Sequence, residues 1–427
     1  MFGVLLDRVV KKGSVTLVRA SGRTNTYGDG SGSPITIRLH QDRLSWKLAL
    51  NPYLRLGEAY MDGSLTIDPP ARIYDFLDIL LANIGIEWAH PLAKVVGRVR
   101  RAKRRIDQFN PTGRAKANVA HHYDLDGGLY DLFLDDDRQY SCAYFDHPGM
   151  SLSDAQHAKK RHIAAKLQIA PGMKVLDIGC GWGGMALYLA RTTGAHVTGV
   201  TLSEEQHKTA TERVAAAGLS HQIDIRLQDY RQLDAEFDRI VSVGMFEHVG
   251  VGHYDEFAAQ LKALLSPDGV ALLHTIGRLD SPGATNPWIA KYIFPGGYIP
   301  ALSEVAPVLE RHGLLLNDLE VLRLHYAETL RHWRERFLTR WDEAVSLYDE
   351  RFARMWEFYL AGSETSFRHE GMVVFQFQLT RQIDRLPLTR DYISAWEKTR
   401  SAERTHFADA VPSDTRAALL TYPQSHV

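Results

Sequence analysis

The sequence predicts an α/β fold, in which a parallel sheet is covered by helices on both faces and follows a small α/β domain. From about residue 153 onward, short apolar segments alternate with amphipathic helical patterns, which is typical of a parallel sheet with two buried faces. The first 90 residues or so alternate in the β manner, with turn formers between the strands. A length of 427 residues, 45% of them hydrophobic, allows two or three domains.

The small N-terminal domain is expected at residues 1–92. Its expected elements are three strands and a later helix, at residues 14–19, 34–40, 44–50 and 71–84. An apolar stretch near the start of the chain is broken by Asp7 and Arg8. We therefore expect no secretion signal.

A basic segment at residues 93–117 joins this domain to the next. Residues 94–116 hold nine Lys or Arg against Asp107 alone, although the whole chain has 50 basic and 51 acidic residues. Apolar residues recur at helical spacing from Val95 to Ile106, which predicts a basic amphipathic helix. Two interpretations stay open: contact with an anionic lipid surface, or a solvated helix between two domains.

The second domain is expected at residues 118–395, followed by a tail at 396–427. Its expected strands, with helices between them, lie at residues 174–178, 195–200, 223–228, 237–243, 269–275 and 372–379. Two long helical patterns, at 327–343 and 347–361, precede the last strand. They interrupt the alternation, so we expect an insertion that could lie as a lid over the carboxyl ends of the strands.

A glycine-rich turn follows the first of these strands, in the segment Asp177-Ile178-Gly179-Cys180-Gly181-Trp182-Gly183. Such a turn lets backbone amides and a helix N-terminus approach a ligand. Gly179, Gly181 and Gly184 also match the dinucleotide-binding pattern, and the glycines could simply make a tight turn. Asp177 lies at the strand end and no acidic residue ends the second strand, which favours S-adenosylmethionine over a nicotinamide dinucleotide.

A set of short motifs runs in order through about residues 115–385. The motifs are His122-Tyr123-Asp124, Tyr140 to Phe145, the 175–184 loop, Gly199 to Gln206, Gly244 to Val249, Leu273 to Gly277, Tyr292 to Gly297 and His325-Tyr326. Together they resemble the cyclopropane fatty acid synthases. The residues before 110 resemble the N-terminal extension of the branch that modifies bacterial phospholipids, whereas the mycolic acid branch begins near the equivalent of Tyr123.

The resemblance implies a fold, an activity and a cellular setting. The fold would be a Rossmann-like class I methyltransferase domain with a seven-stranded sheet and a helical lid insertion. The activity would be transfer of a methylene from S-adenosylmethionine to the cis double bond of unsaturated phospholipid acyl chains. Such an enzyme would be a cytoplasmic homodimer in peripheral contact with the inner face of the membrane.

The family's site residues can be transferred to matching positions of this sequence. The implied cofactor residues are Tyr123, Tyr140 and Ser141 for methionine, Asp177, Gly179 and Gly181 in the loop, Thr201, Leu202 and Gln206 for ribose, and Asp229 and Tyr230 for adenine. The family also binds a bicarbonate ion, whose ligands match Cys142, Glu247, His274, Ile276 and Tyr326. For Cys142 and Ile276 we expect a backbone role.

The chemistry explains why such groups are needed. An alkene is a weak nucleophile, so methyl transfer requires close positioning and leaves a carbocation, which aromatic faces can stabilise. Ring closure then needs a base for a proton of the new methyl group. We expect one proton to be shared between Glu247 and bicarbonate, with His274 and Tyr326 donating, because two adjacent anions cannot both stay unpaired.

Other functions stay open. A methyl-branching or methylene-forming fatty acyl methyltransferase, a small-amine methyltransferase, or a lipid-surface binding protein without turnover could share the fold. Nucleic acid is not an expected partner, because the basic run is confined to the linker and no base-stacking module is evident. No metal is expected, because there is no His-Glu-x-x-His spacing and Cys142 and Cys180 form no Cys-x-x-Cys pair.

Overall fold

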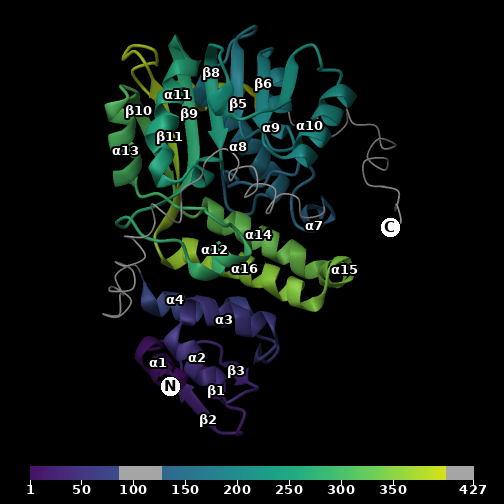
Figure 1. Cartoon of the computed structure of the whole chain (residues 1–427), viewed down its shortest axis with the longest axis vertical. Coiled ribbons are helices and arrows are strands. Elements are labelled where there is room, and N and C mark those ends of the chain that lie inside the picture. Colours follow the sequence, from purple (N-terminus) through teal and green to yellow (C-terminus); the bar gives the residue numbers. More distant parts are fainter. Residues whose placement is uncertain (86–126, 401–427) are drawn as a thin grey trace.

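The computed structural model describes residues 1–85 and 127–400. A small N-terminal sheet lies at one end of the molecule and a larger sheet at the other, with a layer of helices between them (Figure 1). The expected linker at 93–117 and most of the expected tail lie outside the described residues, so the domain limits remain predictions. Within the described ranges, no helix is long and apolar enough to cross a membrane.

The N-terminal sheet has four strands in the order β2-β1-β3-β4, with β1 and β3 parallel. Its strands are β1 (Val15–Val18), β2 (Thr24–Tyr27), β3 (Ile35–Leu39) and β4 (Leu65–Ile67). The helices beside it are α1 (Phe2–Val9), α2 (Leu44–Leu50), α3 (Pro52–Met61) and α4 (Ile73–Ile84). Alternate strand residues such as Leu17 and Ile37 are fully buried and share one core with the helices. The first two expected strands and the helix at 71–84 are confirmed.

The strand expected at residues 44–50 is wrong, because this segment is helix α2. Leu44 and Leu48, one helical turn apart, are buried, whereas Trp46 and Leu50 are 58% and 80% exposed. A short segment with apolar residues at every second position fits both periodicities. Packing of the Leu44 and Leu48 pair against the N-terminal core favours the helix.

The larger sheet has seven strands, as the family resemblance implied, in the order β10-β11-β9-β8-β5-β6-β7. They are β5 (Lys174–Ile178), β6 (His196–Thr201), β7 (Ile223–Leu227), β8 (Phe237–Val243), β9 (Leu265–Arg278), β10 (Leu315–Leu322) and β11 (Met372–Thr380). The five neighbouring strands β9, β8, β5, β6 and β7 are parallel to one another. Strand β11 is antiparallel to both of its neighbours, β9 and β10. The edge strand β10 was missed, because Asn317, Asp318 and Glu320 interrupt its apolar pattern.

Helices cover both faces of this sheet, as expected. They are α8 (Leu152–Leu167), α9 (Gly184–Thr193), α10 (Glu204–Ala216), α11 (Tyr254–Leu264), α13 (Leu302–Arg311) and α17 (Asp391–Arg400), with the short α7 (Gly127–Asp131) and α12 (Pro287–Tyr292). On one face α8, α9 and α10 pack against strand residues such as Val175. On the other, α11 and α13 pack against residues such as Leu176. Neighbouring strand residues point to opposite faces, so one continuous apolar strand serves both cores.

The helical insertion between β10 and β11 consists of α14 (His325–Thr339), α15 (Trp341–Leu347) and α16 (Glu350–His369). The Tyr359 hydroxyl lies 2.8 Å from that of Tyr140, and its ring lies 6.0 Å from that of Phe294. Phe358 and Ala361 of α16 pack instead against the N-terminal core. The insertion therefore lies where the lid was expected, and it also connects the two sheets (Figure 1).

Candidate active site

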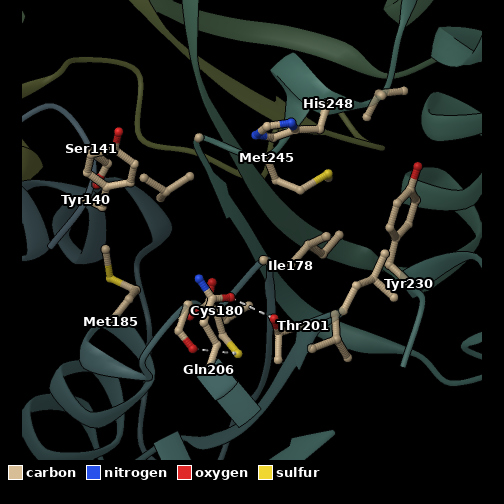
Figure 2. Close-up of a pocket in the computed structure, with 18 of the residues that line it drawn as sticks. Tyr140, Ser141, Ile178, Cys180, Met185, Thr201, Gln206, Tyr230, Met245 and His248 are labelled. Atoms are coloured by element: carbon tan, nitrogen blue, oxygen red, sulfur yellow. Dashed lines mark hydrogen bonds between the residues drawn. The ribbon is translucent and has the colours of Figure 1, made fainter. Parts of the chain in front are cut away.

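A pocket opens at the carboxyl ends of β5, β6 and β8, the edge where α/β sheets bind ligands (Figure 2). The turns that follow these strands line it, with Gly179 to Trp182 after β5, Leu202 after β6 and Gly244-Met245 after β8. Residues 138–141 and Pro295-Gly296 line it from outside the sheet. The pocket therefore lies where the glycine-rich turn predicted a ligand site.

The turn after β5 has a backbone shape that glycine adopts most readily. Gly179 and Gly181 have φ angles of 80° and 54°, in the left-handed region. The backbone amides of Gly179 and Cys180 donate to the carbonyl of Val200 at 2.9 and 3.0 Å, which ties the turn to β6. Helix α9 begins at Gly184, so the positive end of its dipole lies beside the turn.

Most of the expected cofactor residues line this one pocket. They are Tyr140, Ser141, Asp177, Gly179, Gly181, Thr201, Leu202, Gln206, Asp229 and Tyr230. Figure 2 shows Tyr140 and Ser141 on one side of the pocket and Tyr230 on the other, with Thr201 and Gln206 between them. The remaining expected residue, Tyr123, lies outside the described residues. An elongated ligand could contact both sides at once.

Two hydrogen-bonded pairs fix polar groups at the β6 and β7 side of the pocket. The Thr201 hydroxyl donates to Oε1 of Gln206 at 2.8 Å, so the amide NH2 of Gln206 is the group left for a ligand. The Arg231 guanidinium donates to both oxygens of Asp229, at 2.9 and 2.6 Å. Arg231 therefore fixes the orientation of the Asp229 carboxylate. Arg231 was not among the expected residues.

Lys159, buried in α8, positions the segment that carries Ser141. Its Nζ donates to Oε1 of Gln139 at 2.7 Å and to Oγ of Ser141 at 2.8 Å. Burial lowers the pKa of Lys159. The sequence does not reveal this role, because nothing in the helical pattern distinguishes Lys159 from the exposed lysines of other helices.

Asp177 ends β5 at the floor of the pocket. It is 2% exposed, and its Oδ2 has no hydrogen-bond partner among the described residues. Burial raises the pKa of Asp177 to about 7, although the charge of Lys159 opposes this shift. A cationic ligand would favour the ionised carboxylate, so the position is suited to a positively charged group.

The residues expected to bind bicarbonate do not line this pocket. Three of them, Glu247, His274 and Ile276, lie at the carboxyl end of β9. Oε1 of Glu247 accepts a hydrogen bond at 2.5 Å from the backbone amide of Ile276, so this amide is occupied. In the described ranges, Oε2 of Glu247 and Nε2 of His274 are buried without a partner. His274 and Ile276 are two residues apart in β9, so their side chains share a face. Burial raises the pKa of Glu247 to about 7 and lowers that of His274 well below its ordinary value.

Cys142 and Tyr326 belong to the aromatic core against which Ile276 packs. Cys142 is 1% exposed, and burial raises the pKa of its thiol, which therefore stays protonated. Tyr326 is the second residue of α14, and its ring contacts those of Trp333 and Phe367. Glu247, His274 and Ile276 thus lie at the carboxyl end of β9, and Cys142 and Tyr326 belong to the core that Ile276 contacts.

Two further pocket residues outside the expected set, His248 and Trp182, lie in motifs that carried the resemblance. His248 lies beside Met245 (Figure 2), and burial lowers its pKa to about 4. Trp182 packs edge-on against Tyr130, with ring centroids 5.0 Å apart, and its Nε1 donates to Glu205 at 3.0 Å. Across residues 1–85 and 127–400, no group of three His, Cys, Asp or Glu side chains could hold a metal ion.

Comparison with known proteins gives closely related sequences over most of the chain. Cyclopropane-fatty-acyl-phospholipid synthase of Escherichia coli K12 is 40% identical over 352 residues, 82% of this chain and 89% of that protein. Tuberculostearic acid methyltransferase UfaA1 of Mycobacterium tuberculosis H37Rv is 36% identical, over 88% of this chain and 90% of its own length. A domain family of unknown function matches residues 5–79.

Comparison of structures agrees with this result. Mycolic acid cyclopropane synthase CmaA1, solved in complex with SAH and CTAB, matches with a TM-score of 0.59 at 35% identity, over 64% of this chain and 99% of CmaA1. This match confirms the expected methyltransferase fold. The sequence profile of the family described as mycolic acid cyclopropane synthetase matches residues 111–377, and the chain belongs to that family.

Proposed function

We propose that the chain transfers a methylene from S-adenosylmethionine to the cis double bond of an unsaturated phospholipid acyl chain, forming a cyclopropane ring. One observation carries the proposal: Met245 and His248, which flank Glu247 in the sequence, line the pocket at the carboxyl ends of β5 and β6, and Glu247 and His274 hold buried polar atoms that have no partner among the described residues. The pocket suits the cofactor. The buried atoms suit a reaction that removes a proton away from water.

S-adenosylmethionine supplies an electrophilic methyl carbon on a positively charged sulfur. The complex of the related CmaA1 with SAH supports this donor. The residues proposed to bind it are Tyr123, Tyr140, Ser141, Asp177, Gly179, Gly181, Thr201, Leu202, Gln206, Asp229 and Tyr230. In this set, Asp177 provides the negative charge and Tyr230 the aromatic face for the adenine.

Aromatic side chains next to the pocket support an apolar substrate and a cationic intermediate. The ring of Tyr140 lies 5.4 Å from that of Tyr130 and 5.2 Å from that of Trp333. These rings belong to a buried cluster that also holds Ile276. An aromatic face stabilises a desolvated cation by about 2 kcal/mol or more, so this cluster could protect the cation and exclude water.

Glu247 and His274 fit the bicarbonate ion that the family resemblance implies. A carboxyl group whose pKa is raised to about 7 can hold a proton that it shares with a second anion. The proposed ligands are Cys142, Glu247, His274 and Tyr326, and Ile276, whose amide already donates to Glu247, would contribute by holding that carboxyl group. When bound, bicarbonate would supply the base for the proton that ring closure releases. Glu247, fixed to β9 by the Ile276 amide, would orient it.

Methyl branching is the second candidate, favoured by the 36% identity to tuberculostearic acid methyltransferase UfaA1. The same pocket and the same first transfer would serve it. The two functions differ in the fate of the cation, which either loses a proton from the new methyl group or is quenched in another way.

Mass analysis of membrane lipids tests the proposal, in a bacterial host that lacks cyclopropane lipids and expresses this chain. We expect monounsaturated chains to gain one CH2 and to resist mild hydrogenation. A gain of CH2 with two further hydrogens would indicate a saturated methyl branch, and a product that takes up hydrogen would indicate a methylene group. Unchanged lipids, with a protein that binds S-adenosylmethionine, would contradict the proposal.

We further propose that α2 contacts an anionic lipid surface, from which the enzyme reaches its substrate. Trp46 and Leu50 are 58% and 80% exposed, and Arg43 and Lys47 of the same segment are also exposed. Exposed apolar residues beside basic ones are suited to a membrane interface. A peripheral position at the inner face of the membrane, and a homodimer, remain part of this proposal.

A further inference from the structure

A line of hydrogen bonds leads from His274 through the protein interior to α8. Gln376 of β11 pairs with His274 of β9 across the sheet, and its Nε2 lies 3.1 Å from Nδ1 of His274. On its other side, Oε1 of Gln376 lies 2.7 Å from Nζ of Lys166. His274 is 2% exposed, and Gln376 and Lys166 are 0% exposed. Bulk water therefore does not compete for these bonds.

The chemistry of lysine fixes the direction of the bonds. Burial lowers the pKa of Lys166, but the ion pair with Glu320 opposes this shift and favours the ammonium form. An ammonium group only donates. The Gln376 atom next to Lys166 must therefore be its oxygen, which agrees with the geometry. The Gln376 amide nitrogen then donates to His274, so Nδ1 of His274 is the acceptor.

The position of the His274 proton follows. Burial, together with the charges of Lys159 and Lys166, holds the pKa of His274 well below its usual range, so the ring is neutral. A neutral imidazole carries one proton, and Nδ1 is already an acceptor. The proton is therefore on Nε2, the buried atom that has no partner among the described residues.

We propose that Lys166 and Gln376 are positioning residues that hold His274 in the Nε2–H tautomer and so make it a hydrogen-bond donor to the active site. The consequence for catalysis rests on the proposed function. A His274 held in this way donates to a bound anion and cannot accept the proton that ring closure releases. That proton must go to another group.

Nitrogen-15 NMR of histidine-labelled wild-type protein tests the tautomer directly. The chain has 19 histidines, so a His274→Gln sample is needed to assign the His274 signals. We expect a protonated Nε2 and an unprotonated Nδ1. A proton on Nδ1 would overturn the proposal, whether or not the protein makes cyclopropane lipids. A protonated Nε2 in a protein without cyclopropane product would support the tautomer and contradict only the proposed function.

Gln376→Glu tests the part played by the amide. A carboxylate accepts from both neighbours, so the His274 proton should move to Nδ1, and turnover should fall about 10- to 100-fold with little change in the KM for S-adenosylmethionine. Gln378→Glu is the matched control in the same buried strand, because Gln378 contacts the Lys166 carbonyl and Tyr392. There the proton should stay on Nε2. A proton that stays on Nε2 in Gln376→Glu, or leaves it equally in both variants, would contradict the positioning role.

Discussion

Oε1 of Glu247 accepts a hydrogen bond from the backbone amide of Ile276 at 2.5 Å, while its Oε2 is buried with no partner in the described part of the chain. One oxygen thus fixes the carboxyl group to β9, and the other is left for a ligand. Burial raises the pKa of Glu247 to about 7 despite the amide, which stabilises the anion. A carboxyl group anchored in this way can share a proton without moving.

Glu247→Gln should therefore impair the chemical step more than cofactor binding. The amide side chain keeps the shape and can still accept from Ile276, but it cannot exchange a proton. We expect turnover to fall by about 10²-fold or more, with a nearly unchanged dissociation constant for S-adenosylmethionine. Single-turnover kinetics and calorimetry measure the two effects. The exposed Glu236→Gln is the control, and an equal loss of affinity and turnover would contradict the role.

Cofactor binding should depend on pH through Asp177. Burial raises the pKa of Asp177 to about 7, so the carboxyl group is protonated below that pH when no ligand is bound. A sulfonium ion favours the ionised form, so binding should release a proton at lower pH and should tighten as the pH rises through about 7. Asp177→Asn should bind more weakly and lose this dependence. Calorimetry in buffers of different ionisation enthalpy counts the proton, and its absence would show that Asp177 does not respond to the cofactor.

The raised pKa of Asp177 should make the stability of the ligand-free protein depend on pH in the opposite direction to cofactor binding. The folded state keeps a proton on Asp177 that the unfolded chain releases above the ordinary pKa of 3.8. Stability should therefore fall as the pH rises from about 4 to about 7. Urea denaturation at several pH values should show a smaller fall for Asp177→Asn than for the wild type, and identical profiles would contradict the shift.

Tyr230 should provide the stacking surface for the adenine. Its ring is held edge-on by Phe257, with centroids 5.7 Å apart. Tyr230→Ala should weaken cofactor binding by about 1–3 kcal/mol, the usual contribution of a base stacked on an aromatic ring. Tyr230→Trp keeps an aromatic face and should bind nearly as well as the wild type. Calorimetric titration with SAH measures both, and an unchanged affinity of the alanine variant would place the adenine elsewhere.

The sequence was most informative where one local pattern determines the structure. Most positions of β5 and β8 are buried and many are apolar, which makes them recognisable as strands, and their limits agree with the prediction. Segment 44–50 was misassigned, because its short pattern fits a strand and a helix equally well and only packing with the N-terminal core distinguishes them. Strand β10 was missed because this edge strand carries polar residues on half-buried positions, which breaks the apolar pattern.

The site residues also fall into those that local sequence predicts and those that only the folded structure reveals. The turn at Gly179 and Gly181 could be predicted, because its chemistry is contained in consecutive residues. Lys166 and Gln376 could not, since they are 210 residues apart in the sequence and meet only in the folded protein. Each taken alone is an ordinary polar residue in an amphipathic or buried element. Their role depends on the direction of hydrogen bonds between elements, which no periodicity encodes.

Gly57 of α3 should be required for the contact between the N-terminal helices and the rest of the chain. A Cβ atom there would lie 2.4 Å from Nε1 of Trp288 in α12 and 2.8 Å from Cε1 of Phe358 in α16. Gly57→Ala should therefore lower the free energy of unfolding by about 1–3 kcal/mol. Gly362→Ala is the control in α16, where the nearest atom lies 3.9 Å away, and it should stabilise by up to about 1 kcal/mol. Equal effects in thermal denaturation would contradict the close contact.

The exposed side chains of α2 should bind the protein to anionic lipid. Burying a large apolar side chain contributes about 1.5–3 kcal/mol, so Trp46→Ala with Leu50→Ala should weaken binding to vesicles of anionic phospholipid at least about 10-fold. Arg43 and Lys47 add a charge contribution that salt screens, so binding should also weaken with ionic strength. Sedimentation of the protein with vesicles measures both effects.

The control for α2 must be an equally exposed leucine elsewhere. Leu388 is 103% exposed and follows β11, far from α2 in the sequence, so Leu388→Ala should leave vesicle binding unchanged. Because the α2 side chains are exposed, the double variant should keep its melting temperature and its turnover on detergent-dispersed lipid, and should lose activity only on vesicles. If it bound and modified vesicles like the wild type, the membrane contact would have to lie on another surface.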